Sequence, residues 1–375
     1  MVVASGIRDM ASRIAELDAA YRWSAWQTGD MDIAKAQELW QPLPGWLNTA
    51  SYGLPPRPAW DDLMAALSDW REGRTSWEGW DAATQRSREA FARIVGVDAH
   101  DVVAGSQVSA LLSSIAAALP DGTRVLASDI EFTSFLYPFV VHADRGVEVE
   151  TVPTATYLDA IRPGVDVVAF SLVQSSNGEV ADYPAIVAAA RSVGALVLVD
   201  ATQACGWLPF DATLADGVFT AGYKWLMSPR GTALAYLTPA LRERLRPIAA
   251  GWYAGEVPYS SYYGLPMTLA GDARRFDVSP AWFSWVAMAP TLELIEHIGL
   301  EAIREHDVVL ANRFLVGLGR PPGDSAIVAV EVPGAQERLE AAGVRAAVRA
   351  GRVRASFHIY STEHDVDLAL DALTG

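Results

Sequence analysis

Short apolar runs alternate with amphipathic stretches through the middle of the chain. Short continuous apolar runs predict buried strands, and apolar positions three or four residues apart predict helices. Strands are expected at 101–104, 123–127, 147–151, 165–172, 195–199, 218–220 and 232–237. Helices are expected between them at 108–119, 132–144 and 184–193. This order predicts an α/β fold with a mostly parallel sheet between layers of helices.

The pattern differs at both ends of the chain. Helical periodicity is present at 5–39, 58–72 and 81–95. Downstream, a long helix over 280–319 is expected, followed by shorter elements at 327–332, 336–342, 353–357 and 363–373. We therefore expect a large domain over 46–291 and a smaller α+β C-terminal domain over 292–375, with the helical segment 1–45 packed beside it.

Composition narrows the class of protein. The net charge is −16, and no run of lysine or arginine stands out, so a nucleic-acid partner is not expected. The sequence contains no apolar run of about 18 residues and no signal-peptide pattern in its first ten residues, so a membrane partner is not expected either. The single cysteine, Cys205, excludes an intrachain disulfide. Together these features predict a cytoplasmic protein.

Lysine is rare in this chain. Of its 29 basic residues, 27 are arginine and only Lys35 and Lys224 are lysine. An amine can form an imine with a carbonyl compound, whereas a guanidinium group stays protonated. Lys35 lies in an ordinary helical pattern and is interpreted as a solvated residue. Lys224 is therefore the candidate nucleophile.

Asp200 and Gln203 follow an apolar strand, and Lys224 follows the next one. Taken singly, Asp200 is also explained as a helix cap and Lys224 as a surface lysine. Together they match what pyridoxal 5'-phosphate (PLP) requires. The amine forms the Schiff base, the carboxylate pairs with the pyridine nitrogen, and the amide donates near the phenolate oxygen.

A phosphate-binding turn is expected at Gly105-Ser106-Gln107. It lies between the strand at 101–104 and the helix at 108–119. Backbone N–H groups at a helix N-terminus bind phosphate well, although the same residues are also explained as a plain turn.

At this point the sequence resembles the class V aminotransferase group of fold-type-I PLP enzymes. This group includes cysteine desulfurases, selenocysteine lyases, kynureninases and isopenicillin N epimerase-like proteins. The resemblance runs from Leu47-Asn-Thr-Ala-Ser-Tyr-Gly53 to the segment that begins at Val353-Arg-Ala-Ser-Phe. Its most specific elements are Asp200-Ala-Thr-Gln203, Gly222-Tyr-Lys224-Trp-Leu226 and Pro229-Arg-Gly231.

The resemblance implies roles for individual residues. Lys224 and Asp200 would be catalytic. The cofactor would also contact the phosphate-loop residues, the stacking ring of Phe132 in Ser128-Asp-Ile-Glu-Phe132, and three further polar or aromatic side chains. These cofactor residues are Ser106, Gln107, Phe132, Ser175, Gln203 and Tyr223. Asn48 and Arg354 would bind the substrate, because a guanidinium group suits a carboxylate.

The resemblance further implies a homodimer with a shared active site. Trp252, in Gly251-Trp-Tyr-Ala-Gly-Glu256, resembles a segment that each subunit lends to its neighbour. Ser279, in Arg275-Phe-Asp-Val-Ser279, resembles one that lends a phosphate contact. The aromatic stretch 252–285 is equally explained as a buried dimer interface.

Several features argue against other classes of enzyme. The region 343–352 holds no cysteine where cysteine desulfurases need one, and position 132 is phenylalanine rather than histidine. The six histidines show no metal-ligand spacing, so no metal site is expected. Gly317–Gly323 lacks the strand and helix of a dinucleotide unit, and no GxSxG hydrolase motif surrounds Ser106.

The expected function is a PLP-dependent reaction on a small amino-acid substrate. We expect a lyase that cleaves a Cβ–S or Cβ–C bond without a catalytic cysteine. An aminotransferase or an amino-acid epimerase of the same fold is the alternative. A non-catalytic PLP-binding protein is a second alternative.

Overall fold

The large sheet has seven strands and lies at the centre of the computed structural model, which describes residues 31–349 and 351–375. Its strands follow the order β1-β7-β6-β5-β4-β2-β3. Their bounds are β1 (Val102–Gly105), β2 (Arg124–Ser128), β3 (Glu148–Val152), β4 (Val167–Ser171), β5 (Leu196–Asp200), β6 (Gly217–Ala221) and β7 (Ala233–Leu237). Only β7 runs antiparallel to its neighbours, so the prediction of a mostly parallel sheet is confirmed.

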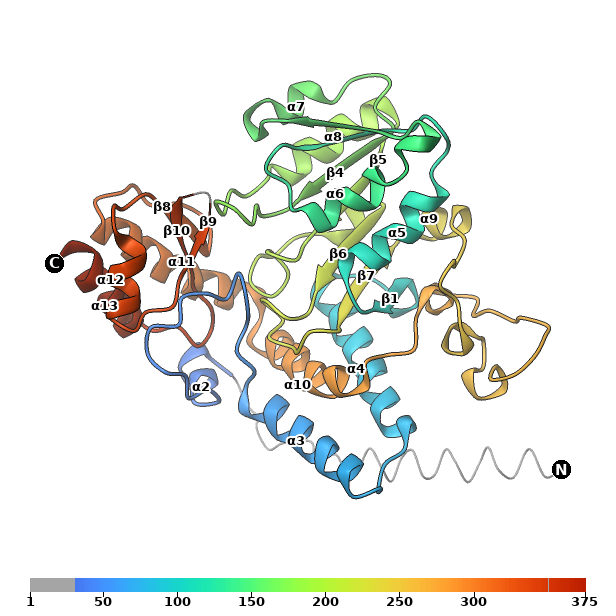
Figure 1. The fold of residues 1–375 in the computed structure, drawn as a ribbon, viewed down its shortest axis with the longest axis horizontal. Coiled ribbons are helices and arrows are strands. Elements are labelled where there is room, and N and C mark those ends of the chain that lie inside the picture. The colour runs from blue at the N-terminus through green and yellow to red at the C-terminus, as the bar shows by residue number, and fades with distance from the viewer. Residues whose placement is uncertain (1–30, 350) are drawn as a thin grey trace.

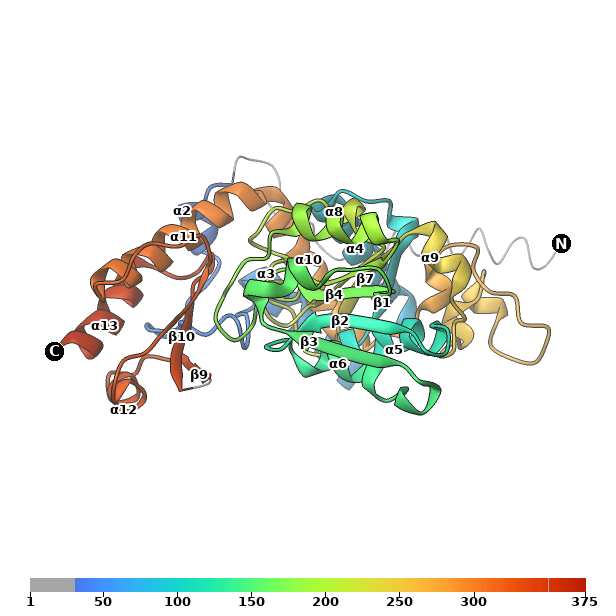
Figure 2. The same ribbon diagram turned by 90° about the horizontal axis from the view of Figure 1, so that it is seen from above.

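Helices cover both faces of this sheet (Figures 1 and 2). Val167 and Ala169 of β4 pack into one core with α5 and α6, while Val168 and Phe170 pack into the other with α4, α8 and α10. Burial on both faces explains why the strands are continuous apolar runs. The helix bounds are α3 (Arg57–Arg71), α4 (Trp77–Val95), α5 (Val108–Ala118), α6 (Thr133–Val140), α7 (Tyr157–Ala160), α8 (Tyr183–Val193), α9 (Pro239–Arg244) and α10 (Trp282–Ile298).

A second, three-stranded antiparallel sheet lies in the C-terminal part of the chain, in the order β8-β10-β9. It consists of β8 (Ile327–Val330), β9 (Ala347–Arg349) and β10 (Arg352–Ser356). Its helices are α11 (Leu300–Gly317), α12 (Ala335–Ala341) and α13 (Glu363–Thr374). Short 3-10 helices connect other elements at Ala99–Asp101, Ala143–Arg145, Thr154–Thr156, Ala212–Leu214, Trp252–Ala254, Pro258–Ser260 and Ala273–Phe276.

The described N-terminal residues pack beside this smaller sheet. Helix α2 (Ile33–Gln37) contacts α11, and the Gln37 side chain donates to the carbonyls of Ile359 and Ser361, each at 3.0 Å. Most of the helix that the sequence predicts over 5–39 falls on residues 1–30, outside the described residues. None of the helices in the described ranges is long and apolar enough to cross a membrane.

Two expectations for secondary structure were wrong, and one strand was not expected. The helix expected over 280–319 is two helices, because Gly299 adopts φ +87 and separates α10 from α11. The helix expected over 132–144 ends at Val140 and is followed by a 3-10 turn. The strand β9 was not expected, because Ala347-Val348-Arg349 is short and largely exposed.

Candidate active site

One pocket lies at the carboxyl ends of β4, β5 and β6, where ligands of open parallel sheets bind. Seven of the residues that the sequence predicts for the site line it: Gln107, Phe132, Ser175, Asp200, Gln203, Tyr223 and Lys224. The other lining residues are Val108, Ser109, Ser134, Ser171, Thr202, Ala221 and Arg230. Segments far apart in the sequence therefore form one polar cavity.

Lys224 is buried in this pocket. Burial lowers the pKa of its amine to about 8, and the positive charges of Arg354, Arg230 and Arg349 act in the same direction. Asp200 opposes them. The Nζ atom lies 5.3 Å from the centroid of the Phe132 ring. The lowered pKa raises the share of neutral amine near pH 7 above that of an ordinary lysine, and only a neutral amine can attack a carbonyl or take a proton.

Asp200 ends strand β5 with its side chain buried beside Lys224. Its Oδ1 atom accepts a hydrogen bond of 2.8 Å from the backbone N–H of Thr202. Burial raises the pKa of this carboxyl group, while Thr202 and the Lys224 charge oppose the shift. A buried carboxylate gains most from a cation held against it, and this position suits a protonated pyridine nitrogen.

The Gln203 side chain forms hydrogen bonds with three separate segments of the chain at the pocket. Its Nε2 atom donates to Ser175 Oγ at 3.0 Å and to the Ala50 carbonyl at 3.1 Å. Its Oε1 atom accepts from the Trp225 indole at 2.8 Å. The Trp225 indole therefore fixes the orientation of the Gln203 amide, and the nitrogen of the amide is directed into the pocket.

Arg354 reaches the same side of the pocket from β10. Its guanidinium group donates to the Ser175 carbonyl at 2.5 Å and to Ser51 Oγ at 2.8 Å, and its Nε atom is buried without a hydrogen-bond partner among the described residues. Burial and the neighbouring Arg349 lower its pKa to about 10. No described carboxylate forms an ion pair with Arg354, and the group therefore suits the carboxylate of a substrate.

The turn after β1 brings the N-terminus of α5 to the pocket. Gln107 is the N-cap residue, and Gln107, Val108 and Ser109 line the pocket. Ser106 instead lines an adjacent cavity with Leu111 and Phe276. Of the two predicted phosphate-loop side chains, only that of Gln107 thus lines the pocket that contains Lys224.

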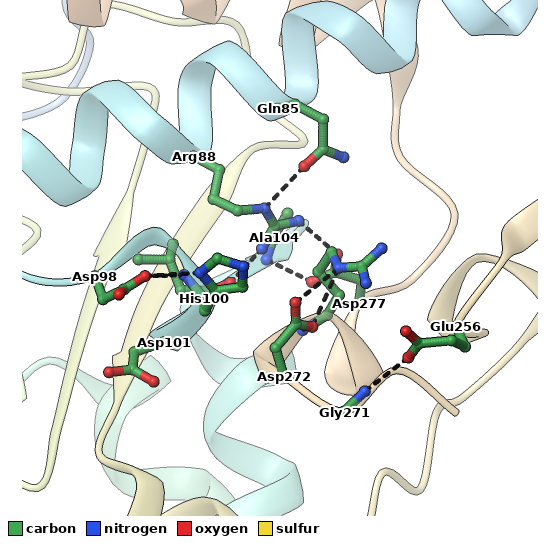
Figure 3. A network of polar contacts seen from close by, with 12 residues as sticks. Gln85, Arg88, Asp98, His100, Asp101, Ala104, Glu256, Gly271, Asp272 and Asp277 are labelled. Atoms are coloured by element: carbon green, nitrogen blue, oxygen red, sulfur yellow. Dashed lines mark hydrogen bonds and ion pairs between the residues drawn. The ribbon is translucent and has the colours of Figure 1, made fainter. Parts of the chain in front are cut away.

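A buried ion pair holds the strand β1 that leads into this turn (Figure 3). Arg88 of α4 donates to Asp277 at 2.5 Å, and the other oxygen of Asp277 accepts from the backbone N–H of Ala104 at 2.8 Å. Arg88 also donates to the Val102 carbonyl. These bonds attach β1 to the segment that contains Ser279.

Five predicted site residues do not line the pocket of this chain: Ser106, described above; Arg354, which contacts the lining residue Ser175; and Trp252, Ser279 and Asn48. Trp252 belongs to an aromatic cluster, with its ring centroid 5.1 Å from that of Trp77. Ser279 follows the Asp277 anchor and does not line the pocket. Asn48 pairs with Ser356 through a backbone bridge, and its Oδ1 atom is buried without a described partner. The expectation that Trp252 and Ser279 serve a neighbouring subunit remains a prediction.

Sequence reasoning gave no role to Arg230 or Glu131, although both lie in motifs that it used. Arg230 stacks over the Tyr223 ring at 4.2 Å and donates to the Tyr52 hydroxyl at 2.9 Å. Glu131 is buried and accepts from the Ser171 backbone N–H at 2.7 Å, which anchors the turn before Phe132. The contacts of these two residues depend on the tertiary fold. In the sequence, only the motifs that contain them point to the site.

The residues of this pocket fit PLP. Lys224 offers an amine with a lowered pKa, and Asp200 offers a buried carboxylate next to it. Phe132 is about half exposed and leaves a ring face free for stacking. The N-terminus of α5 offers backbone N–H groups for a phosphate. The fold and the pocket together define a PLP enzyme of fold type I.

The comparison with known proteins identifies the family. Residues 71–330 match the model of the aminotransferase class-V family, and the chain belongs to that family. An uncharacterized aminotransferase of Bacillus subtilis, YcbU, is 27% identical over 336 residues, covering 84% of this chain and 87% of that protein. Isopenicillin N epimerase of Streptomyces clavuligerus is 27% identical over 405 residues, covering 92% and 99%.

Solved structures show the same fold. A structure of C-DES with glycine covalently linked to its PLP cofactor gives a TM-score of 0.80 at 19% identity, covering 92% of this chain and 99% of that one. The cystine C–S lyase C-DES in complex with its reaction product cysteine persulfide gives 0.78 at 20% identity, covering 88% and 97%. The predictions of a class V fold, of an enzyme and of PLP as its cofactor are confirmed.

Proposed function

We propose that this enzyme is a lyase that cleaves a Cβ–S or Cβ–C bond of an amino acid without a catalytic cysteine. The observation that carries the proposal is the position of Cys205, the only cysteine of the chain. It is buried, it does not line the pocket, and burial raises the pKa of its thiol to about 12. A persulfide-forming nucleophile needs an accessible thiolate.

The roles of the pocket residues follow from their positions. PLP supplies an electron sink that makes the Cα proton of the substrate acidic. The Lys224 amine takes that proton, and Asp200 keeps a proton on the pyridine nitrogen. Arg354 and Asn48 would hold the substrate, and the Gln203 amide would donate toward the phenolate oxygen. Gln107, Tyr223 and the backbone at Ser106 would hold the phosphate.

The residues of the pocket support elimination over two-base epimerisation. The titratable side chains that line it in the described ranges are Asp200, Tyr223, Lys224 and Arg230. Of these, the pKa of Lys224, about 8, suits a base near neutral pH, and a second base would be needed on the opposite face of the substrate. Aminotransferase activity is the second candidate, because YcbU is named as an aminotransferase.

Replacing Cys205 tests this proposal directly. Because the thiol is buried away from the pocket, we expect Cys205→Ala to keep activity within about twofold. Both proteins should cleave a β-substituted amino acid without any added 2-oxo acid, with release of ammonia when a Cβ–S bond breaks by elimination. Mass spectrometry should detect no persulfide on the enzyme during turnover, because the sulfur leaves as a free thiol or sulfide.

Two results would contradict the proposal. An inactive Cys205→Ala protein with an intact visible cofactor spectrum would return the chain to persulfide chemistry. Amino-group transfer that depends strictly on a 2-oxo acid would assign it to the aminotransferases.

We also propose that the enzyme is a homodimer with a shared active site. The segment 248–267 exposes large apolar side chains, with Tyr263 95% and Leu265 89% exposed. Such a patch favours a protein partner. Figure 1 shows this segment as a loop that projects from the large sheet on the side away from the small one. A second copy that covers this segment would bring Trp252 and Ser279 of one chain near the pocket of the other. In their own chain these two residues do not line the pocket.

Sedimentation tests the homodimer. At micromolar concentration the protein should sediment at twice its chain mass of 40.4 kDa. The double variant Tyr263→Ser/Leu265→Ser should weaken association by about tenfold or more, because buried apolar anchors dominate such interfaces. Leu43→Ser alters an equally exposed residue outside the segment and should not change association. A fully active monomer would contradict the proposal.

A further inference from the structure

Three arginines lie on one face of the β9–β10 hairpin. In the antiparallel register, Arg352 is directly opposite Arg349, and Arg354 is directly opposite Ala347. Side chains alternate between the faces of a strand, so Arg352 and Arg354 lie on the same face, and Arg349 joins them there. Val353 and Ala355 lie on the other face, in the core of the small sheet.

This face is directed toward the pocket. Arg354 donates to Ser51 Oγ and to the Ser175 carbonyl, and Ser356, two residues further on, accepts from the Ala50 backbone N–H at 2.9 Å. Figures 1 and 2 show β9 on the side of the small sheet that faces the large sheet. Arg349 also acts electrostatically on both Lys224 and Arg354, which is consistent with its position near them.

The hairpin arginines have no acidic partner among the described residues. Arg349 donates to the Val348 carbonyl, and no ion pair of the described residues includes Arg349 or Arg352. Other exposed arginines of this acidic chain do have acidic partners, as Arg93 has in Glu296. Like charges directly opposite each other weaken an antiparallel pair. The facing pair Arg349 and Arg352 therefore costs stability unless an anion lies between or beside them.

The phosphate of PLP is not the anion that Arg349 and Arg352 would bind. In the proposed function, the N-terminus of α5 and Tyr223 would hold the phosphate, and Arg354, from which the hairpin extends, would bind the substrate's own α-carboxylate. Arg352 lies two residues from Arg354 along β10, on the same face and about 7 Å away. This spacing is comparable to the length of a glutamate-sized side chain.

We propose that the substrate carries a second acidic group on its side chain, and that Arg349 and Arg352 bind it. The ligand class is an amino acid with a distal carboxylate or a comparable oxyanion. This inference rests on the proposed reaction of an amino acid at Lys224 and makes that function more specific. Arg349 and Arg352 would select the substrate, and they would take no part in proton transfer.

The test compares each acidic amino acid with its neutral amide on the PLP-loaded enzyme. Dissociation constants for L-glutamate and L-glutamine, and for L-aspartate and L-asparagine, are measured from the absorbance of the bound cofactor. At least one acid should bind about tenfold more tightly than its amide, and this preference should weaken at high salt. The double variant Arg349→Gln/Arg352→Gln should abolish the preference while amide binding stays within about twofold.

Matched variants separate the specific effect from a general loss of charge. Arg320→Gln removes an exposed arginine outside the hairpin and should leave the preference unchanged. Arg349→Lys/Arg352→Lys keeps both charges and should retain part of it. Thermal melting should not fall in the glutamine variant, because the substitution relieves a like-charge pair.

The outcomes distinguish this inference from the function on which it rests. Equal binding of acid and amide by the native enzyme would overturn the inference alone, as would an equal loss of both ligands in the glutamine variant. If no amino acid changed the spectrum of the PLP-loaded enzyme, the proposed function would fall, and the inference with it.

Discussion

Lys224→Ala is expected to lower kcat by about three orders of magnitude without unfolding the protein. The variant loses both the covalent attachment of PLP and the base that takes the Cα proton, and a positioned general base alone contributes about 10²–10⁴-fold. Steady-state kinetics and the visible spectrum measure the two losses separately. PLP should still bind, because Asp200 and the N-terminus of α5 remain.

Two controls accompany this variant. Lys35→Ala removes the only other lysine, an exposed residue of α2, and should keep full activity. The melting temperature of Lys224→Ala should not fall, because burial disfavours the charged amine that the substitution removes. A Lys224→Ala protein with a tenth or more of the native activity would contradict the role of this lysine.

Asp200→Asn is expected to lower turnover by about 10² or more while the fold is retained. Asparagine has the same shape and can still accept the hydrogen bond from Thr202. It carries no charge to keep the pyridine nitrogen protonated. Loss of a charge-assisted hydrogen bond costs about 1.5–3 kcal/mol in cofactor binding, and loss of the electron sink adds to this in the rate.

The measurements for Asp200→Asn are the dissociation constant of PLP, kcat and the melting temperature. Because burial raises the pKa of this carboxyl group, the neutral amide should fit its position at least as well as the carboxylate does. Near-normal turnover would show that Asp200 only caps the turn after β5. A large fall in melting temperature without a fall in kcat would lead to the same conclusion.

The strands of the large sheet and the ends that carry the site could be predicted from the sequence. Leu196–Asp200 is an apolar run that ends in a carboxylate, and such a run is buried on both faces of a parallel sheet. The carboxyl end of the strand places Asp200 at the ligand-binding edge. The rarity of lysine then singled out Lys224, and the structure places both residues in one pocket.

Other features depend on tertiary contacts that no local pattern encodes. The direction of the Ser106 side chain is set by how the turn packs against Leu111 and Phe276. The strand β9 forms because it pairs with β10. Its own residues show no apolar periodicity that would predict a strand. The contacts of Arg230 arise because the fold brings the Tyr52 and Tyr223 rings within 5.1 and 4.2 Å of its guanidinium group.

The measurement that tests the account most directly is borohydride reduction of the PLP-loaded enzyme, followed by peptide mapping. Lys224 is the buried amine in the pocket, whereas Lys35 is exposed on α2. The account predicts a native protein that absorbs visible light, and about one pyridoxyl group per chain fixed on Lys224 after reduction. A label on Lys35, or no label on any lysine, would contradict it.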